Sequence, residues 1–169
     1  MTHADFHLAE LNIARLRAPL DAPELKEFVD FLDPVNRFAE ESPGFVWRLV
    51  GDDGQSSSYL PPAYDDPMVI TNLSVWTNLA SLRDFMYGTV HRYFLQSRRK
   101  WFERMTQPHV VLWWIPAGEL PTLDDAKSRL QLLEDRGSTS AAFTLENPYD
   151  ADGMPLPRKP GSHERSEPA

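Results

Sequence analysis

Apolar residues recur with strand periodicity in four segments and with helical periodicity in two long segments, and the order of these segments constrains the fold most. The strand-like segments are rich in β-branched and aromatic residues and lie at 7–16, 44–50, 68–76 and 109–116. The helical segments lie at 20–42 and 78–105. The order β-α-β-β-α-β is that of the ferredoxin-like split βαβ motif. We therefore predict an α+β fold, with a four-stranded antiparallel sheet that carries both helices on one face.

Capping and breaking residues set the expected ends of the two long helices. Asp21 is the predicted N-cap of the first helix. Pro34 is expected to bend or interrupt that helix, because a proline inside a helix removes a hydrogen bond. Thr77 or Asn78 is the predicted cap of the second helix, which is expected to run to about Met105.

Further elements are expected between and after these segments. Residues 51–67 are rich in turn-forming residues and make a loop of unusual length. A third helix is predicted from a cap at Thr122 to a stop at Gly137, and one more short strand is expected at 138–145.

The chain is expected to divide at about residue 145. Residues 1–145 form one ferredoxin-like α/β-barrel domain, whereas residues 146–169 are rich in proline and charge and are expected to be a disordered tail. With helices on one face only, the other face of the sheet would be open, and its strands are too apolar to remain in water. We therefore expect a second copy of the chain to cover that face, which predicts a homodimer.

Charge and composition exclude several classes of partner and site. The formal net charge of −8 argues against nucleic-acid binding, which depends on basic charge. The chain has no cysteine, so it has no thiol nucleophile and no thiolate metal site. The histidines lack the spacing of known metal ligands, and we predict neither a metal nor a cofactor. The absence of an apolar run of membrane length and of a secretory signal predicts a cytoplasmic protein that does not bind membranes.

Two stretches resemble a known superfamily. "NLSVWTNLASLRDFMYGTVH" (72–91) resembles the strand end and helix of the antibiotic-biosynthesis monooxygenase-like, dimeric α/β-barrel superfamily. The later "H…RRKWF" run resembles a related domain family of that fold which has no assigned function. The resemblance covers about residues 7–116, extending toward 145. It implies a small-molecule protein of the group that includes cofactor-free quinone-forming oxygenases, haem-degrading oxygenases and isomerases, as well as members without catalysis.

The resemblance does not imply haem degradation. Haem-degrading members carry an asparagine on the first strand, and Asn12 matches it. Phe85 stands where they carry a tryptophan, and His91 comes about one turn earlier than their histidine. Two of three positions therefore depart from the pattern.

Helical periodicity divides the basic stretch "VHRYFLQSRRKWFERM" (90–105) into two faces. Arg99 falls on a polar arc that faces water. Arg98 falls on a second stripe, made by Tyr87, His91, Phe94, Arg98, Phe102 and Met105. An unpaired buried charge is costly, so Arg98 is expected either to pair with Glu10 or an acid of the first helix, or to hold a substrate oxygen anion. His91 is either a structural residue or a proton shuttle beside that anion.

The strands supply the facing wall of this expected site. Glu10 and Asn12 alternate together on the first strand, as do Asn72, Ser74 and Trp76 on the third. Such polar side chains must bind one another, water or a ligand, or else line the dimer seam. The predicted catalytic residues are His91, Arg98, Asn72 and Asn12. The predicted substrate-binding residues are Tyr87, Phe94, Trp47, Trp76, Trp113 and Glu10, with core packing as the alternative for the tryptophans.

The resemblance, taken with these residues, implies a cofactor-independent small-molecule enzyme of secondary-metabolite type, either an oxygenase or a cyclase/isomerase. Its substrate would be apolar and polycyclic or conjugated, since tryptophans would stack on its rings while amides and Arg98 hold an oxyanion. The alternative is a non-catalytic dimeric protein of the same fold that binds such a ligand.

Overall fold

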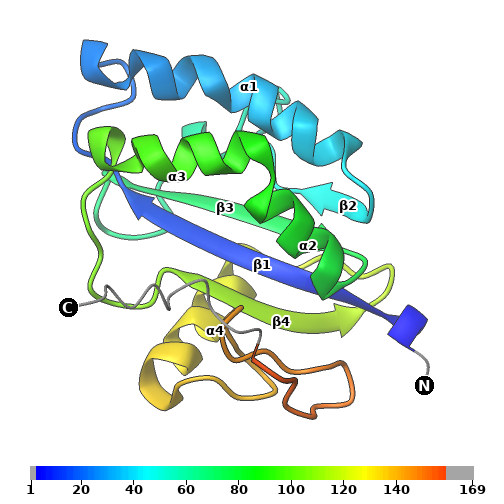
Figure 1. Ribbon diagram of the computed structural model, residues 1–169. Coiled ribbons are helices and arrows are strands. Elements are labelled where there is room, and N and C mark those ends of the chain that lie inside the picture. The colour runs from blue at the N-terminus through cyan, green and yellow to red at the C-terminus, as the bar shows by residue number, and fades with distance from the viewer. Residues whose placement is uncertain (1–2, 159–169) are drawn as a thin grey trace, which may run out of the picture.

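A four-stranded antiparallel sheet forms the centre of the molecule (Figure 1). The computed structural model describes residues 3–158, apart from the side chains of His3, Thr89, Val90, His91 and Leu95. The strand order is β2-β3-β1-β4. The bounds are β1 Phe6–Arg15, β2 Phe45–Arg48, β3 Val69–Trp76 and β4 Val110–Pro116. The predicted α+β fold with a split βαβ sheet is confirmed, and each strand lies within two residues of its predicted bounds.

Three helices cover one face of the sheet (Figure 1). They are α1 (Lys26–Glu41), α2 (Leu79–Tyr87) and α3 (Thr89–Trp101). α1 is preceded by a short 3-10 turn, Pro23–Leu25, so the predicted N-cap at Asp21 is wrong. The helix continues through Pro34, which is exposed, so the predicted interruption does not occur. Asn78 caps α2 as predicted, since its side-chain oxygen accepts a hydrogen bond of 2.8 Å from Ser81 N.

The second predicted helix is divided in two at Gly88. Gly88 has an extended backbone (φ −66°, ψ 169°) that ends α2 and begins α3. Glycine has a low helix propensity, and a Cβ atom here would lie only 3.2 Å from the carbonyl oxygen of Asp84. α3 ends at Trp101, so Met105 lies beyond it. The prediction of one continuous helix from 78 to 105 is therefore wrong, and Tyr87 does not continue the stripe of α3.

A fourth helix, α4 (Leu123–Arg136), covers the opposite face of the sheet (Figure 1). Thr122 caps it as predicted, through a capping box with Asp125, and Gly137 (φ 69°) ends it. Ala126, Leu130 and Leu133 of α4 are buried in one cluster with the sheet residues Leu11 and Trp113. The expectation of an open apolar face is wrong, because α4 of the same chain occupies it. That face therefore gives no reason to expect a homodimer.

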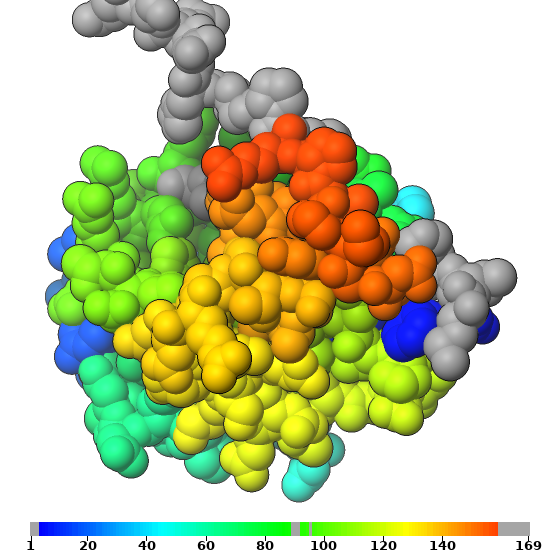
Figure 2. All heavy atoms as spheres, turned by 90° about the horizontal axis from the view of Figure 1, so that it is seen from below, coloured from blue at the N-terminus to red at the C-terminus, as the bar shows by residue number. Residues whose placement is uncertain are grey.

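The chain after α4 packs along the free edge of β4. Phe143 and Leu112 exchange backbone hydrogen bonds of 2.8 and 2.9 Å, but this is an isolated bridge and no regular strand forms at 138–145. Beyond it, the indole nitrogen of Trp114 donates a hydrogen bond of 2.9 Å to the Tyr149 carbonyl oxygen. Figure 2, which views the molecule from below, shows this segment in orange and red beside the yellow α4.

The prediction of a tail disordered from residue 146 is wrong for residues 146–158. Tyr149 and Leu156 pack against the buried cluster that contains Leu112 and Phe143. The composition of the segment concealed these contacts, since a few aromatic and apolar anchors suffice to hold a proline-rich chain. Among the described residues, no helix is long and apolar enough to cross a membrane.

Candidate functional site

A row of polar side chains crosses the sheet on the face that α1, α2 and α3 cover. β1 and β3 pair so that Glu10 lies opposite Ser74, and Asn12 lies opposite Asn72. Alternation along each strand turns these side chains to the same face. The predicted grouping of Glu10, Asn12 and Asn72 on one wall therefore follows from the observed register.

Glu10 is the buried member of this row. Its side chain is 7% exposed and accepts a hydrogen bond of 2.8 Å from the Ser74 hydroxyl, which in turn accepts one of 3.0 Å from the Trp76 indole nitrogen. Burial raises the pKa of Glu10 to about 7, against the lowering effect of the Ser74 hydrogen bond. Among the described side chains, none forms an ion pair with Glu10. The alternative in which Arg98 pairs with Glu10 is therefore wrong.

Arg98 lies at a cavity of about 150 Å³ between α3 and the sheet, which we call the Arg98 cavity. Arg98 is half-buried as a residue, and no hydrogen bond or ion pair joins its guanidinium to another described residue. Its neighbours in the wall are mostly apolar, and the main side chains are Asn12, Met86, Phe94, Phe102, His109 and Val110. Arg99, the next residue, is exposed, so the predicted difference between the two arginines is found.

His109 also lines the Arg98 cavity, and it is not among the predicted site residues. It immediately precedes β4, and its carbonyl oxygen accepts a hydrogen bond of 2.9 Å from Ile13 N, which fixes the backbone beside Asn12. Its Nδ1 atom lies 3.4 Å from the carbonyl oxygen of Gln107. The pairing of β1 with β4 brings the start of β4 next to Asn12, and this strand pairing is the signal that points to His109.

A second cavity, of about 140 Å³, lies between α1, the sheet and the long loop at 51–67. We call it the loop cavity. It shares Asn12, Ala14, Phe94 and Phe102 with the Arg98 cavity, so the two spaces adjoin. Asn72 lines the loop cavity and not the Arg98 cavity.

Four of the other predicted site residues lie elsewhere. Trp47 and Trp113 face the α4 side of the sheet, where Trp113 is 1% exposed. Trp76 lies on the same face as the two cavities but under α2, with its ring stacked on Phe85 at a centroid distance of 5.0 Å.

Tyr87 is 60% exposed, because the break at Gly88 changes the phase of the helix. The side chain of His91 lies outside the described residues, so its predicted role stays a prediction.

An outer groove of about 470 Å³ adjoins the Arg98 cavity. The two share Met86, His109 and Val110, and the groove also contains the exposed Tyr87. No three histidine, aspartate or glutamate side chains of the described residues are grouped as metal ligands.

Comparison with known proteins gives one family match and several distant structural similarities. The family model "Domain of unknown function (DUF3291)" matches residues 7–159, in agreement with the predicted domain family without an assigned function. No curated protein matches the chain.

Solved structures from three different organisms are among those that resemble the chain. A conserved protein from Methanosarcina mazei Go1 has 9% identity over 68% of this chain and 95% of its own, with a TM-score of 0.47. SnoaB, a cofactor-independent oxygenase from Streptomyces nogalater, has 16% identity over 67% of this chain and 94% of its own, with a TM-score of 0.43. A putative antibiotic biosynthesis monooxygenase from Chloroflexus aurantiacus J-10-fl has 11% identity over 69% of this chain and 98% of its own, with a TM-score of 0.41. These values are too low to transfer an activity.

Proposed function

The chain belongs to the family described as Domain of unknown function (DUF3291), and from that premise we propose that it binds a small conjugated ligand at Arg98 and converts it without a metal or organic cofactor. The reaction class is that of an oxygenase or a cyclase/isomerase that begins by removing a proton from the substrate. Formation of an enolate or phenolate oxygen is the step that these residues are suited to support.

The observation that carries the proposal is Arg98, a half-buried residue that lines a largely apolar cavity and whose guanidinium has no acidic partner among the described residues. A cation in such a setting attracts an anionic oxygen, because few other groups can compensate its lost hydration. The Asn12 amide lines the same wall and can donate a further hydrogen bond to that oxygen. Together they would stabilise an oxyanion as it forms.

His109 supplies the group that can accept the proton. Imidazole is the commonest general base in enzymes, and His109 lines the cavity together with Arg98. Removal of a proton from carbon or oxygen of the substrate would leave negative charge on the conjugated oxygen. Arg98 and Asn12 would hold that charge while the ring lies against Phe94 and Phe102.

The cavity volumes limit the size of the ligand. An apolar cavity of about 150 Å³ accommodates a molecule the size of benzene. Each of the two adjoining cavities, at about 150 and 140 Å³, therefore fits roughly one ring. A polycyclic substrate would have to occupy both, which requires Phe94 or Phe102 at their shared wall to move.

Turnover assays on purified protein test this function. Keto–enol and phenolic substrates of one to three rings are incubated in air, while oxygen uptake and absorbance are followed. His109→Asn should lower turnover by about 100-fold or more, as expected for loss of a general base, and His7→Asn should leave it largely unchanged, since His7 lines neither cavity. Haem or flavin bands in the absorbance spectrum, or equal turnover in both variants, would contradict the proposal. Binding without turnover would favour the non-catalytic alternative.

A further inference from the structure

The loop at 51–67 forms one wall of the loop cavity. Ser56 and Ser58 line the cavity from the loop, Asn36 lines it from α1, and Asn12 and Asn72 line it from the sheet. Among the described residues, no acidic or basic side chain belongs to this lining. The loop cavity thus differs from the Arg98 cavity in charge, because Arg98 supplies a cation only to the latter.

The asparagine side chains of the loop cavity have no hydrogen-bond partner among the described residues. Asn12 and Asn36 are half-buried, and Asn72 is exposed. A carboxamide carries two N–H donors and an oxygen acceptor, and partly buried polar groups are normally satisfied. The amides of Asn12 and Asn36 are therefore available to water or to a ligand in the cavity that they line, and the exposed Asn72 amide is available at its edge.

The loop is held in place by specific contacts. Asp66, at its end, forms an ion pair of 2.7 Å with Arg15 of β1 and accepts a hydrogen bond of 2.9 Å from Met68 N. Ser56 is 6% exposed, and its hydroxyl accepts a hydrogen bond of 3.3 Å from Ser58 N. Such contacts preorganise the serine side chains before a ligand arrives, which reduces the entropic cost of binding.

The remainder of the wall is apolar and aromatic, with Phe28, Leu32, Ile70 and Phe94 as its main members. A ring fits such a wall, whereas a charged group would lose its hydration there without gaining a counter-ion. Amides and hydroxyls can donate to a carbonyl oxygen and can accept from a hydroxyl group. The chemistry of the lining therefore selects a neutral, oxygen-bearing ring.

We propose that the loop cavity is a second subsite, which binds the neutral hydroxyl- or carbonyl-bearing ring of a ligand whose anionic oxygen lies at Arg98. This rests on the proposed function, because both subsites would serve one ligand. It names the substrate class as a conjugated molecule of about two or three rings. One end of that molecule is acidic and the other carries uncharged oxygen substituents.

Phenol and toluene, which have almost the same size, are suitable probes. Each is titrated into uniformly ¹⁵N-labelled full-length protein, and both the dissociation constant and the side-chain amide signals are recorded. Phenol should shift the amide signals of Asn36 and Asn72. It should leave that of Asn147 in place, because Asn147 lies at a different cavity near the C-terminal segment.

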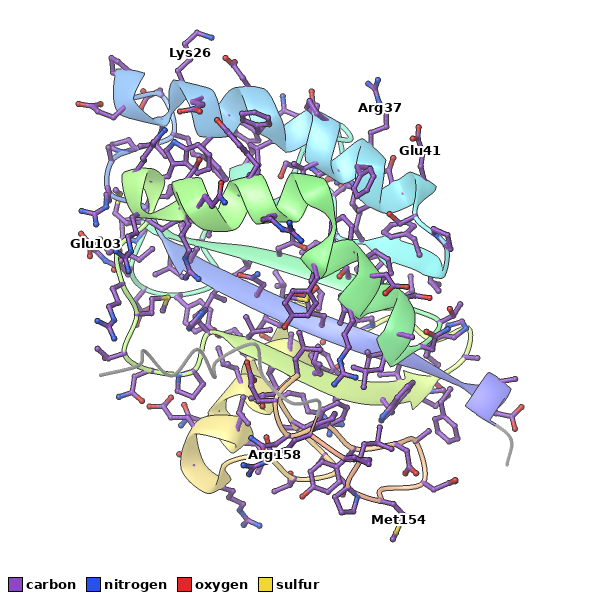
Figure 3. The ribbon with its side chains drawn as sticks, in the orientation of Figure 1. Lys26, Arg37, Glu41, Glu103, Met154 and Arg158 are labelled. Carbon is purple, nitrogen blue, oxygen red and sulfur yellow. The ribbon has the colours of Figure 1, made fainter. Side chains whose placement is uncertain are left out.

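Two leucine variants on α1 provide the matched comparison. Asn36→Leu keeps the number and branching of the side-chain heavy atoms but removes the hydrogen bond, so the ratio of phenol to toluene affinity should fall by about 3- to 10-fold. Arg37→Leu should leave the ratio unchanged, because Arg37 is exposed and points away from the sheet (Figure 3). An unchanged ratio in Asn36→Leu, or phenol shifts absent from Asn36 and Asn72, would overturn the subsite.

A parallel titration with benzoate, followed at the Arg98 Nε signal, separates this inference from the proposed function. A benzoate response at Arg98 without a phenol response at the asparagines would overturn the loop subsite alone. The absence of both responses would overturn the subsite and the proposed function together.

Discussion

Glu10 and Ser74 lie directly opposite each other on β1 and β3, and the Ser74 hydroxyl donates a hydrogen bond of 2.8 Å to the buried Glu10 carboxylate. Ser74 also accepts from the Trp76 indole, so its own donor is directed to Glu10. The carboxyl group has one neutral donor and, among the described residues, no cation beside it. Burial therefore governs its ionisation.

The pKa of Glu10 makes the stability of the protein depend on pH. Burial raises the pKa from 4.5 to about 7, so the folded protein holds this proton more tightly than the unfolded chain does. The contribution of the protonated Glu10 to the free energy of unfolding is therefore fully present below pH 4.5, and it is lost as the pH rises to about 7. Glu10→Gln removes this titration. Between pH 5 and pH 8 its free energy of unfolding should therefore fall by about 2 kcal/mol less than that of the wild-type protein.

Urea unfolding at the two pH values measures this difference. Glu119→Gln is the control, because Glu119 is exposed, and it should retain the dependence of the wild-type protein. An identical pH dependence in wild type and Glu10→Gln would show that Glu10 titrates as an ordinary surface carboxyl group.

Burial of α4 against the sheet gives a second prediction. Leu130 is 5% exposed in the cluster with Trp113, so Leu130→Ala should lower the free energy of unfolding by about 2 to 5 kcal/mol. Leu120→Ala, at a side chain that is 53% exposed, should change it by about 0.5 kcal/mol or less. Equal effects of the two substitutions in denaturant unfolding would mean that α4 does not pack on this face.

The C-terminal segment gives a third prediction. A chain that ends at Leu145 loses the packing of Tyr149 on Phe143, at a ring distance of 6.0 Å, and the hydrogen bond from Trp114. Loss of these contacts and of buried Leu156 surface should cost about 2 kcal/mol and lower the melting temperature by roughly 4 to 8 °C. Calorimetry of the truncated chain checks this, with Met154→Ala, an exposed position, as the control. An unchanged melting temperature after truncation would restore the prediction of a disordered tail.

The sequence predicts the elements of this fold better than their placement. Asn78 and Thr122 act as caps because a capping side chain needs only its own first helical turn. The covering of the second face by α4 could not be predicted, since periodicity identifies the apolar side of a helix but not the surface that it contacts. The break at Gly88 was missed because the hydrophobic pattern continues across it.

In the candidate site, too, local features are predicted better than the placement of residues in space. Arg98 and Arg99 were correctly distinguished, because they lie within the uninterrupted helix α3, where the phase holds. Trp113 packs in the core, which was the stated alternative to substrate binding, because both faces of the sheet are buried and alternation alone does not say which face holds the site. His109 joins the cavity through pairing between strands distant in the sequence, and such pairing follows from the assembled sheet.

The affinity of benzoate for the two arginine variants tests the central claim most directly. Charge-assisted hydrogen bonds contribute roughly 1.5 to 3 kcal/mol. Arg98→Gln should therefore weaken benzoate binding by about 10-fold or more, with its melting temperature nearly unchanged because no ion pair to a described residue is lost. Arg99→Gln should keep the wild-type affinity, since Arg99 faces water. Equal weakening in both variants, or in neither, would contradict an anion site at Arg98.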